Sequence, residues 1–104
     1  MIPNTLLTKE SIILRSNSFI EAEVDGEMVA LDIDKGTCYG LNRVGSRIWA
    51  LIGTGSAVRD ICGQLVKEYR IDDATCERQV LDLLEELRTE GLVRIDDTSV
   101  TPSA

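Results

Sequence analysis

The sequence predicts an α+β fold in which a three-stranded antiparallel sheet is followed by a three-helix bundle. Apolar and polar residues alternate from Ile20 to Val24, which is the period of a strand with one solvated face, and a mainly apolar run follows over residues 28–33. Two turn sequences, Asp25-Gly26 and Asp34-Lys35-Gly36, separate the strands. After residue 42 the apolar spacing changes to that of helices and continues to about residue 90.

The first two strands are predicted over residues 19–24 and 27–33. A two-residue Asp-Gly turn between alternating segments is the strongest short signal for a hairpin, so these strands are expected to be antiparallel. Alternation places Ile20, Ala22 and Val24 on one face and two glutamates on the other, which we interpret as the solvated face.

The third strand is predicted over Thr37–Leu41, and it would lie at the edge of the sheet. Unpaired N–H and C=O groups on an edge can accept another strand. The segment carries no Lys, Pro or charge that would prevent such pairing, and Gly40 allows close approach of another backbone. The edge is therefore expected to bind an extended peptide, unless the N-terminal segment or a second copy of the chain covers it.

Three helices are predicted after the strands. Asn42 is a candidate N-cap of the first, which ends at the glycines of 53–55. Ser56 is a candidate cap of the second, which ends near Arg70. The third helix spans about 72–90, with an aspartate at its start and a glycine after its end.

The apolar residues of the third helix do not form a single stripe. At about 100° per residue the core face is predicted to consist of Cys76, Val80, Leu83 and Leu87. Leu81 and Leu84 lie beside that face, together with Arg88. They either widen the contact with another helix or form one wall of a groove next to the edge strand.

Composition excludes several classes of function. The net charge is −7, with 18 acidic and 11 basic residues, which disfavours nucleic acid as a partner. No apolar run approaches the roughly 20 residues of a membrane span, and the N-terminus lacks the pattern of a signal peptide. We therefore expect a cytoplasmic protein with no membrane partner. Residues 1–17 are predicted to form an N-terminal extended segment, 18–95 the folded domain and 96–104 a flexible tail.

The chain offers no set of residues for catalysis. It has no histidine and only three cysteines, which are widely spaced, so the usual zinc patterns and His-based acid–base schemes are excluded. We interpret Cys38, Cys62 and Cys76 as reduced thiols that behave as small buried hydrophobes. No enzymatic activity, cofactor or metal is expected.

The run from Asp25 to Trp49 resembles the core signature of the PqqD-like family, and the part from Gly36 to Asn42 is the most discriminating. Residues 61–69 and 80–93 resemble the second and third helices of the same family. Members are also described as precursor-peptide recognition elements of ribosomally made, modified peptides. The resemblance implies a winged-helix-like fold and a non-catalytic protein that binds the leader segment of a precursor as an added strand.

The resemblance also implies which residues bind. The backbone ladder would come from Thr37, Cys38, Tyr39, Gly40 and Leu41, and Leu81, Leu84 and Arg88 would line the helix side. Cys38 stands where many relatives have an aromatic residue, which affects the shape of that pocket.

The free-standing form is most similar to the lasso-peptide branch of this family. There the partner is a cysteine-type leader peptidase, and the leaders carry a Tyr and a Pro separated by two residues. The alternatives are a peptide chaperone for a radical enzyme in pyrroloquinoline quinone synthesis and a winged-helix nucleic-acid-binding protein. A homodimer through the edge strand is a further expectation.

Overall fold

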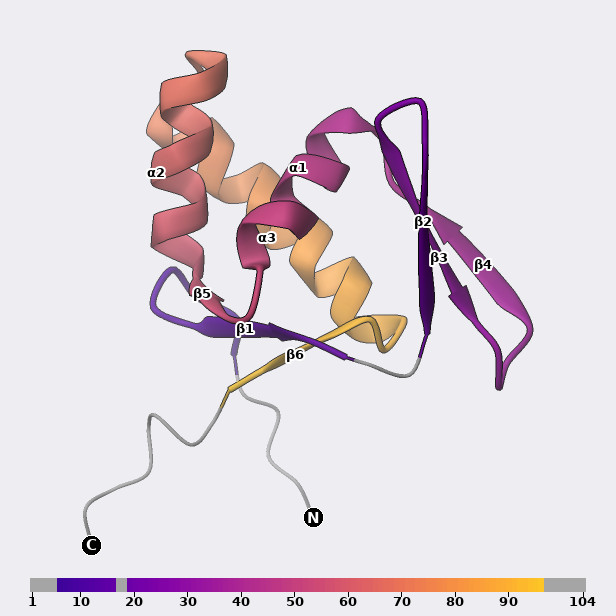
Figure 1. Ribbon diagram of the computed structural model, residues 1–104. Coiled ribbons are helices and arrows are strands. Elements are labelled where there is room, and N and C mark those ends of the chain that lie inside the picture. The colour runs from indigo at the N-terminus through magenta and orange to yellow at the C-terminus, as the bar shows by residue number, and fades with distance from the viewer. Residues whose placement is uncertain (1–5, 17–18, 97–104) are drawn as a thin grey trace, which may run out of the picture.

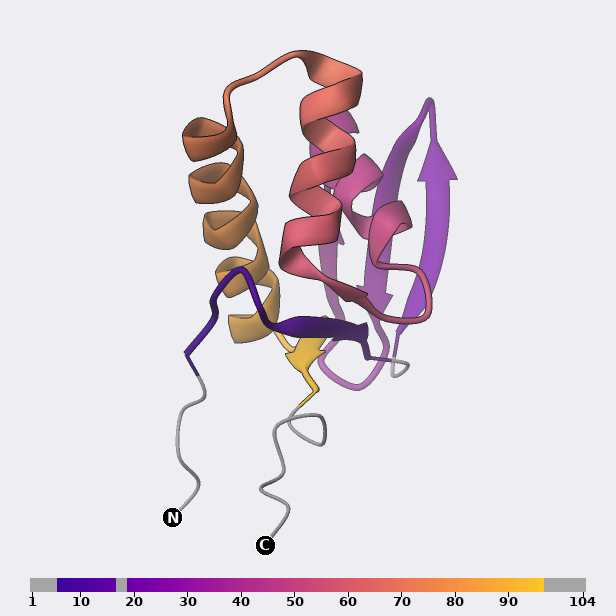
Figure 2. The ribbon, with the colours of Figure 1, turned by 90° about the vertical axis from the view of Figure 1, so that its left-hand side faces the viewer.

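The computed structural model describes residues 6–16 and 19–96, which form six strands in two antiparallel sheets and three helices (Figure 1). Each sheet has three strands, and we call the one with the longer strands the larger sheet. The larger sheet stands on one side of the helices, and the smaller sheet lies below them (Figures 1 and 2). The predicted α+β class is confirmed. The smaller sheet was not predicted.

The larger sheet contains β2 (Ile20–Val24), β3 (Glu27–Asp32) and β4 (Thr37–Gly40) in the order β2-β3-β4. Asp25 and Gly26 connect the first two strands with φ angles of 53° and 82°. Two positive φ values are the signature of the tight turn that matches the twist of a hairpin. The predicted strand order is therefore confirmed, and β4 is an edge strand.

The three helices are α1 (Arg43–Ile52), α2 (Val58–Tyr69) and α3 (Asp73–Thr89). Asn42 caps α1 as predicted, because its Oδ1 accepts a hydrogen bond from the Gly45 N–H at 2.8 Å. Within residues 6–16 and 19–96, no helix combines the length and the apolar character that a bilayer crossing requires.

The predicted cap of the second helix is wrong. Ala57 is the N-cap of α2, and Ser56 belongs to the short strand β5 (Ser56–Ala57). The Ser56 hydroxyl donates instead toward the carbonyl groups of Leu51 and Ile52, at 2.8 and 3.1 Å. It thereby satisfies carbonyls at the end of α1, which have no partner inside that helix.

The second sheet has the order β5-β1-β6, with β1 (Ile12–Arg15) between β5 and β6 (Val93–Ile95). Ile13 is fully buried, so the part of the N-terminal segment that the structure describes belongs to the core. The Asp96 N–H donates to the Ile12 carbonyl at 2.8 Å. The rest of the predicted C-terminal tail, residues 97–104, lies outside the described residues.

The core face of α3 differs from the prediction by one residue. Leu84 is completely buried, whereas Leu83 is only half-buried. The buried set on α3 consists of Cys76, Val80, Leu84 and Leu87. These four residues span about 80° of the helix, as wide as one core-facing stripe. The spacing was therefore correct, but the stripe is rotated toward Leu84, and this residue cannot form an exposed groove wall.

The face assignment of β2 is inverted relative to the prediction. Ile20 and Val24 are 53% and 59% exposed, whereas Glu21 points toward α1. The Glu21 carboxylate accepts a hydrogen bond from the buried Trp49 Nε1 at 3.0 Å and lies 3.7 Å from the Arg15 guanidinium. Because these partners hold the glutamate on the inner face, the apolar side chains of β2 face outward.

The three cysteines are not all alike. Cys62 and Cys76 are buried as predicted, and burial raises the pKa of both thiols. Cys38 is exposed, so its predicted burial is wrong. It lies directly opposite Leu31 in the register of β3 and β4, which places its thiol on the outer face of the sheet.

Candidate functional site

The backbone of β4 exposes hydrogen-bonding groups along its outer edge. The Leu41 N–H donates to the Met28 carbonyl at 2.9 Å, which identifies Met28 and Leu41 as a hydrogen-bonded pair. Such pairs alternate along an antiparallel ladder. The N–H and C=O groups of Cys38 and Gly40 therefore point away from β3. Among the residues that the structure describes, no strand pairs with this edge, since β1 pairs with β5 and β6 instead.

One hydroxyl ends the ladder between β3 and β4. The Met28 N–H donates to the Ser46 Oγ at 2.7 Å, and the Ser46 hydroxyl donates to the Leu41 carbonyl at 3.2 Å. The side chain of α1 thus takes the place of a direct strand-to-strand bond. It connects the end of β4 to the first turn of the helix that follows.

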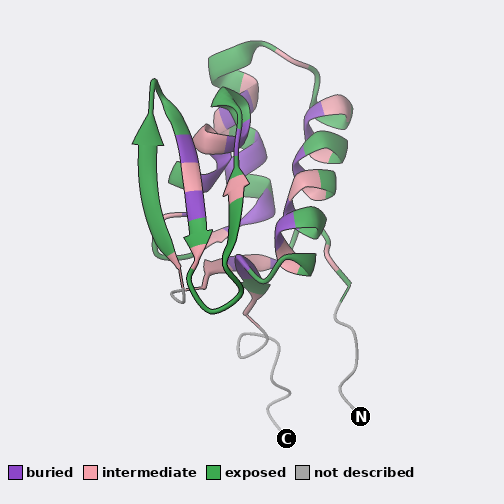
Figure 3. Cartoon of the chain, turned by 90° about the vertical axis from the view of Figure 1, so that its right-hand side faces the viewer, coloured by how far each residue is buried: buried purple, intermediate pink, exposed green. Residues whose placement is uncertain are grey.

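Tyr39 connects β4 to α3. It lies opposite the buried Ala30 in the ladder, so its ring is on the inner face of the sheet. Its hydroxyl donates a hydrogen bond to the Glu86 carboxylate at 2.7 Å. Burial, together with this hydrogen bond, raises the pKa of Tyr39 to about 12. The phenol therefore remains a hydrogen-bond donor at neutral pH. The same contact agrees with the arrangement in Figure 3, where β4 is the strand on the α3 side of the sheet.

The direction in which β4 runs along α3 follows from the turn that precedes it. A Cβ added to Gly91, just after α3, would lie 3.9 Å from the Lys35 ammonium in the β3–β4 turn. The start of β4 is thus near the C-terminal end of α3. The strand then runs toward α1 and the N-terminal half of α3.

The face of α3 next to β4 is the one that carries Glu86. At about 100° per residue, Gln79 lies about 20° and Leu83 about 60° from Glu86 around the helix. We call the space between β4 and these three residues the β4–α3 groove. Leu83 is half-buried and is the apolar member of the groove wall on the helix.

The structure does not bring the two predicted halves of the site together. Leu81, Leu84 and Arg88 lie about 140° to 160° from Glu86 around α3, on the side away from β4. On that side the Glu77 carboxylate is 3.9 Å from the Lys9 ammonium, so this surface faces the N-terminal segment. The predicted strand half lies at the edge of the sheet, whereas the predicted helix half lies on a different face of α3, with Leu84 in the core.

An apolar hollow of about 230 Å³ lies between α1, α2 and the N-terminal half of α3. Its wall includes Gln79 from the Glu86 face of α3, and the first turn of α1 follows β4 directly. The hollow is lined by Val44, Ile48, Leu65, Tyr69, Ile71, Cys76, Gln79 and Val80. Val44 and Tyr69 follow the apolar spacing of α1 and α2, but both are more than 40% exposed because they lie at the ends of these helices.

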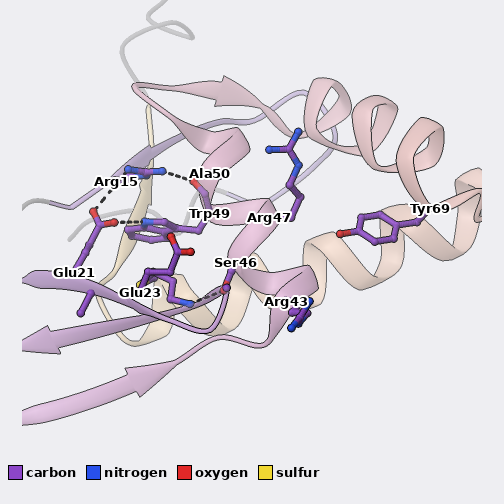
Figure 4. Close-up of a pocket in the computed structure, with 12 residues that line it drawn as sticks. Arg15, Glu21, Glu23, Arg43, Ser46, Arg47, Trp49, Ala50 and Tyr69 are labelled. Carbon is purple, nitrogen blue, oxygen red and sulfur yellow. Dashed lines mark hydrogen bonds and ion pairs between the residues drawn. The ribbon is translucent and has the colours of Figure 1, made fainter.

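A larger hollow of about 710 Å³ lies between β2 and α1, at the other edge of the sheet (Figure 4). Charged side chains line it, and several are paired within the protein. Arg15 lies over the Trp49 ring, 4.7 Å from its centroid, and beside Glu21. Arg47 donates from Nε to the Glu68 carboxylate at 2.9 Å. We interpret these contacts as structural, because they connect β1, β2, α1 and α2.

Both sides of the groove present groups that can bind a peptide. Its strand side presents backbone donors and acceptors, and its helix side presents Leu83 between polar side chains. Within residues 6–16 and 19–96, no three His, Cys, Asp or Glu residues gather in a way that could hold a metal ion.

The part of the chain that contains β4 and α3 matches the model of a known protein family. The model of a family described as coenzyme PQQ synthesis protein D (PqqD) matches residues 27–93. The chain belongs to the PqqD family. The match begins at β3 and ends at the first residue of β6, so it includes β4 and all three helices of this PqqD-family protein.

A solved structure with the same fold is "TbiB1 in Complex with the TbiA(beta) Leader Peptide". The two chains are 36% identical, and the TM-score is 0.73 over 78% of this chain and 94% of the other. A search of curated proteins found no match. A protein with this fold has thus been captured with a leader peptide.

Proposed function

We propose that this PqqD-family protein binds the leader segment of a ribosomally made precursor peptide and delivers it to a separate maturation enzyme. The observation that carries the proposal is the edge of β4 beside the Leu83 face of α3, since within residues 6–16 and 19–96 no strand except β3 pairs with β4. An extended peptide can add to such an edge as another strand, with affinity from main-chain hydrogen bonds and selectivity from pockets for alternate side chains.

The groove determines which groups of the leader would be recognised. The outward N–H and C=O groups of Cys38 and Gly40 would form the ladder, which is largely indifferent to the peptide sequence. Inward side chains of the peptide would contact Tyr39 and Leu83. An apolar side chain at the end toward α1 would enter the 230 Å³ hollow.

The lasso-peptide branch is the form of this function that we favour. The likeness to TbiB1 supports its first step, leader binding, because that protein was solved with its leader peptide. The leader would then carry Tyr and Pro separated by two residues, and the partner would be a cysteine-type leader peptidase in the cytoplasm. Holding the leader on a scaffold that also docks the peptidase would make cleavage effectively intramolecular, at local concentrations up to about millimolar.

The name of the matched family favours a second candidate. A peptide chaperone in pyrroloquinoline quinone synthesis would use the same edge but would present its peptide to a radical enzyme. The two candidates differ in the precursor, so the peptides encoded beside this gene distinguish them.

A titration with labelled peptide tests the proposal. The leader half and the core half of the precursor encoded beside this gene are each labelled with a fluorophore and titrated with the full chain. We expect the leader to bind with a Kd in the micromolar range or below, and the core half to bind at least a hundredfold more weakly. Equal binding of the two halves, or none, would overturn the proposal.

A matched pair of leucines on α3 tests which face of the helix lines the groove. Leu83 and Leu81 are both half-buried, but they lie on different sides of α3. We expect Leu83→Asp to weaken leader binding at least tenfold, about 1.4 kcal/mol, because it places a carboxylate beside the peptide. Leu81→Asp should change the affinity less than threefold. The reverse ranking, with native circular dichroism for both variants, would assign the peptide to the Leu81 side.

A further inference from the structure

The outer face of the larger sheet is apolar across all three strands. Residues directly opposite one another in a sheet point to the same face, and the register pairs Ile20 with Leu31 and Leu31 with Cys38. The strand residues on this face, which we call the outer sheet face, are Ile20, Ala22, Val24, Glu27, Val29, Leu31, Cys38 and Gly40. Glu27 is the one charged residue among them.

This face is open to solvent rather than packed. Ile20 is 53% exposed, Val24 is 59% exposed and Leu31 is 41% exposed. In Figure 3 the face is turned toward the viewer, and β2 is exposed over its whole length. An antiparallel sheet with one solvated face ordinarily carries polar residues there, whereas here Glu21 and Glu23 are on the inner face. Exposed apolar residues that adjoin one another on one face, unlike residues scattered singly, favour an interaction site.

A second copy of the chain is a poor occupant of this face. Three strands about 4.8 Å apart and five residues long cover roughly 250 Å² in projection. A stable interface buries about 800 Å² on each partner, so this face alone is too small for a stable dimer, and a partner that docks here needs further contact area, which an added leader strand supplies. Both ends of the sheet are also acidic, with Asp25 and Glu27 at one end and Asp32 and Asp34 beside a single Lys35 at the other. Face-to-face packing of two copies would therefore bring like charges together.

A peptide strand added to β4 would enlarge the same face. Its outward side chains would continue the outer sheet face, because alternate residues of every strand in a sheet point to one side. A protein that sits there would contact this chain and the bound leader at once. Its surface would need an apolar centre and a rim of Lys or Arg to match the acidic ends of the sheet.

We propose that the outer sheet face is the docking surface for the maturation enzyme, which contacts the sheet and the leader strand together. This inference rests on the proposed function, from which it takes the bound leader. It makes docking stronger when the leader is present, since the enzyme then covers four strands instead of three.

Leu31→Lys tests the docking surface, because Leu31 lies at the centre of the face between Ile20 and Cys38. Leu6→Lys is the matched control, since Leu6 is 79% exposed and precedes the strands. The probe is the purified cysteine-type leader peptidase encoded beside this gene. Leader affinity is measured by titration, and kcat/KM for leader cleavage is measured in the presence of each variant.

We expect Leu31→Lys to bind the leader within twofold of the unaltered chain and to lower kcat/KM at least tenfold, whereas Leu6→Lys should change neither quantity. Unaltered cleavage with Leu31→Lys would overturn the docking surface and leave the proposed function intact. A dimer in sedimentation that Leu31→Lys converts to a monomer, again with normal cleavage, would assign the face to self-association. Failure of the unaltered chain to bind leader would instead overturn the proposed function.

Discussion

Replacement of Leu84 by Asp is expected to unfold the protein. Leu84 is completely buried in the core between α3 and its neighbours. An unpaired carboxylate at such a position costs several kcal/mol, even if the group becomes protonated. The substitution also removes apolar contacts worth about 2–5 kcal/mol in a Leu→Ala change. The sum is comparable to the total stability of a domain, about 5–15 kcal/mol.

Urea denaturation followed by circular dichroism measures this effect. Leu84→Asp should lack a cooperative transition, and Leu84→Ala should lower the free energy of unfolding by about 3 kcal/mol. Leu83→Ala is the matched control, since the same side chain is only half-buried one position away, and it should cost less than about 1.5 kcal/mol. A folded Leu84→Asp variant with near-native stability would contradict the burial of Leu84 and restore it as an exposed wall.

Replacement of Cys38 by Pro is expected to lower leader affinity at least tenfold. The Cys38 N–H points to the free edge of β4, so the proposed peptide loses one ladder hydrogen bond. Proline also places its ring at the edge and fixes φ near −65°. A lost hydrogen bond costs about 1 kcal/mol, and the steric effect adds to it.

The control for this variant is Cys38→Ser, which keeps the N–H and the size of the side chain. Its leader affinity should stay within twofold, because the Cys38 side chain points to the outer face and not into the groove. Thermal melts of both variants show whether the sheet is intact. Equal leader affinity for Cys38→Pro and Cys38→Ser would place the peptide away from the β4 edge.

The strand half of the candidate site could be predicted because local signals specify it. Asp25-Gly26 adopts the two positive φ angles that its turn requires, and the hairpin it makes fixes β3 as the middle strand. The next turn, which contains Gly36, then leaves β4 at the edge. Each of these steps depends on residues that are neighbours in the chain.

The helix half could not be predicted for a physical reason. Helical spacing establishes which residues share a stripe, but Leu83 and Leu84 both fit a core-facing stripe within one residue step. Contacts with distant elements decide between them. The hydrogen bond between Tyr39 and Glu86 joins residues 47 positions apart, so the local sequence around either residue does not predict it.

The sequence by itself determined the α+β class, the hairpin, most of the helix ends and the family resemblance, because turns, caps and periodicity depend on residues close in the chain. Only the tertiary structure decided which faces point where. It placed β1 in the middle of a second sheet, turned Glu21 inward to Trp49, exposed Ile20 and Leu31, and set Leu83 rather than Leu84 beside β4. The reason is that a side chain's burial depends on what packs against it, and those partners come from distant parts of the chain.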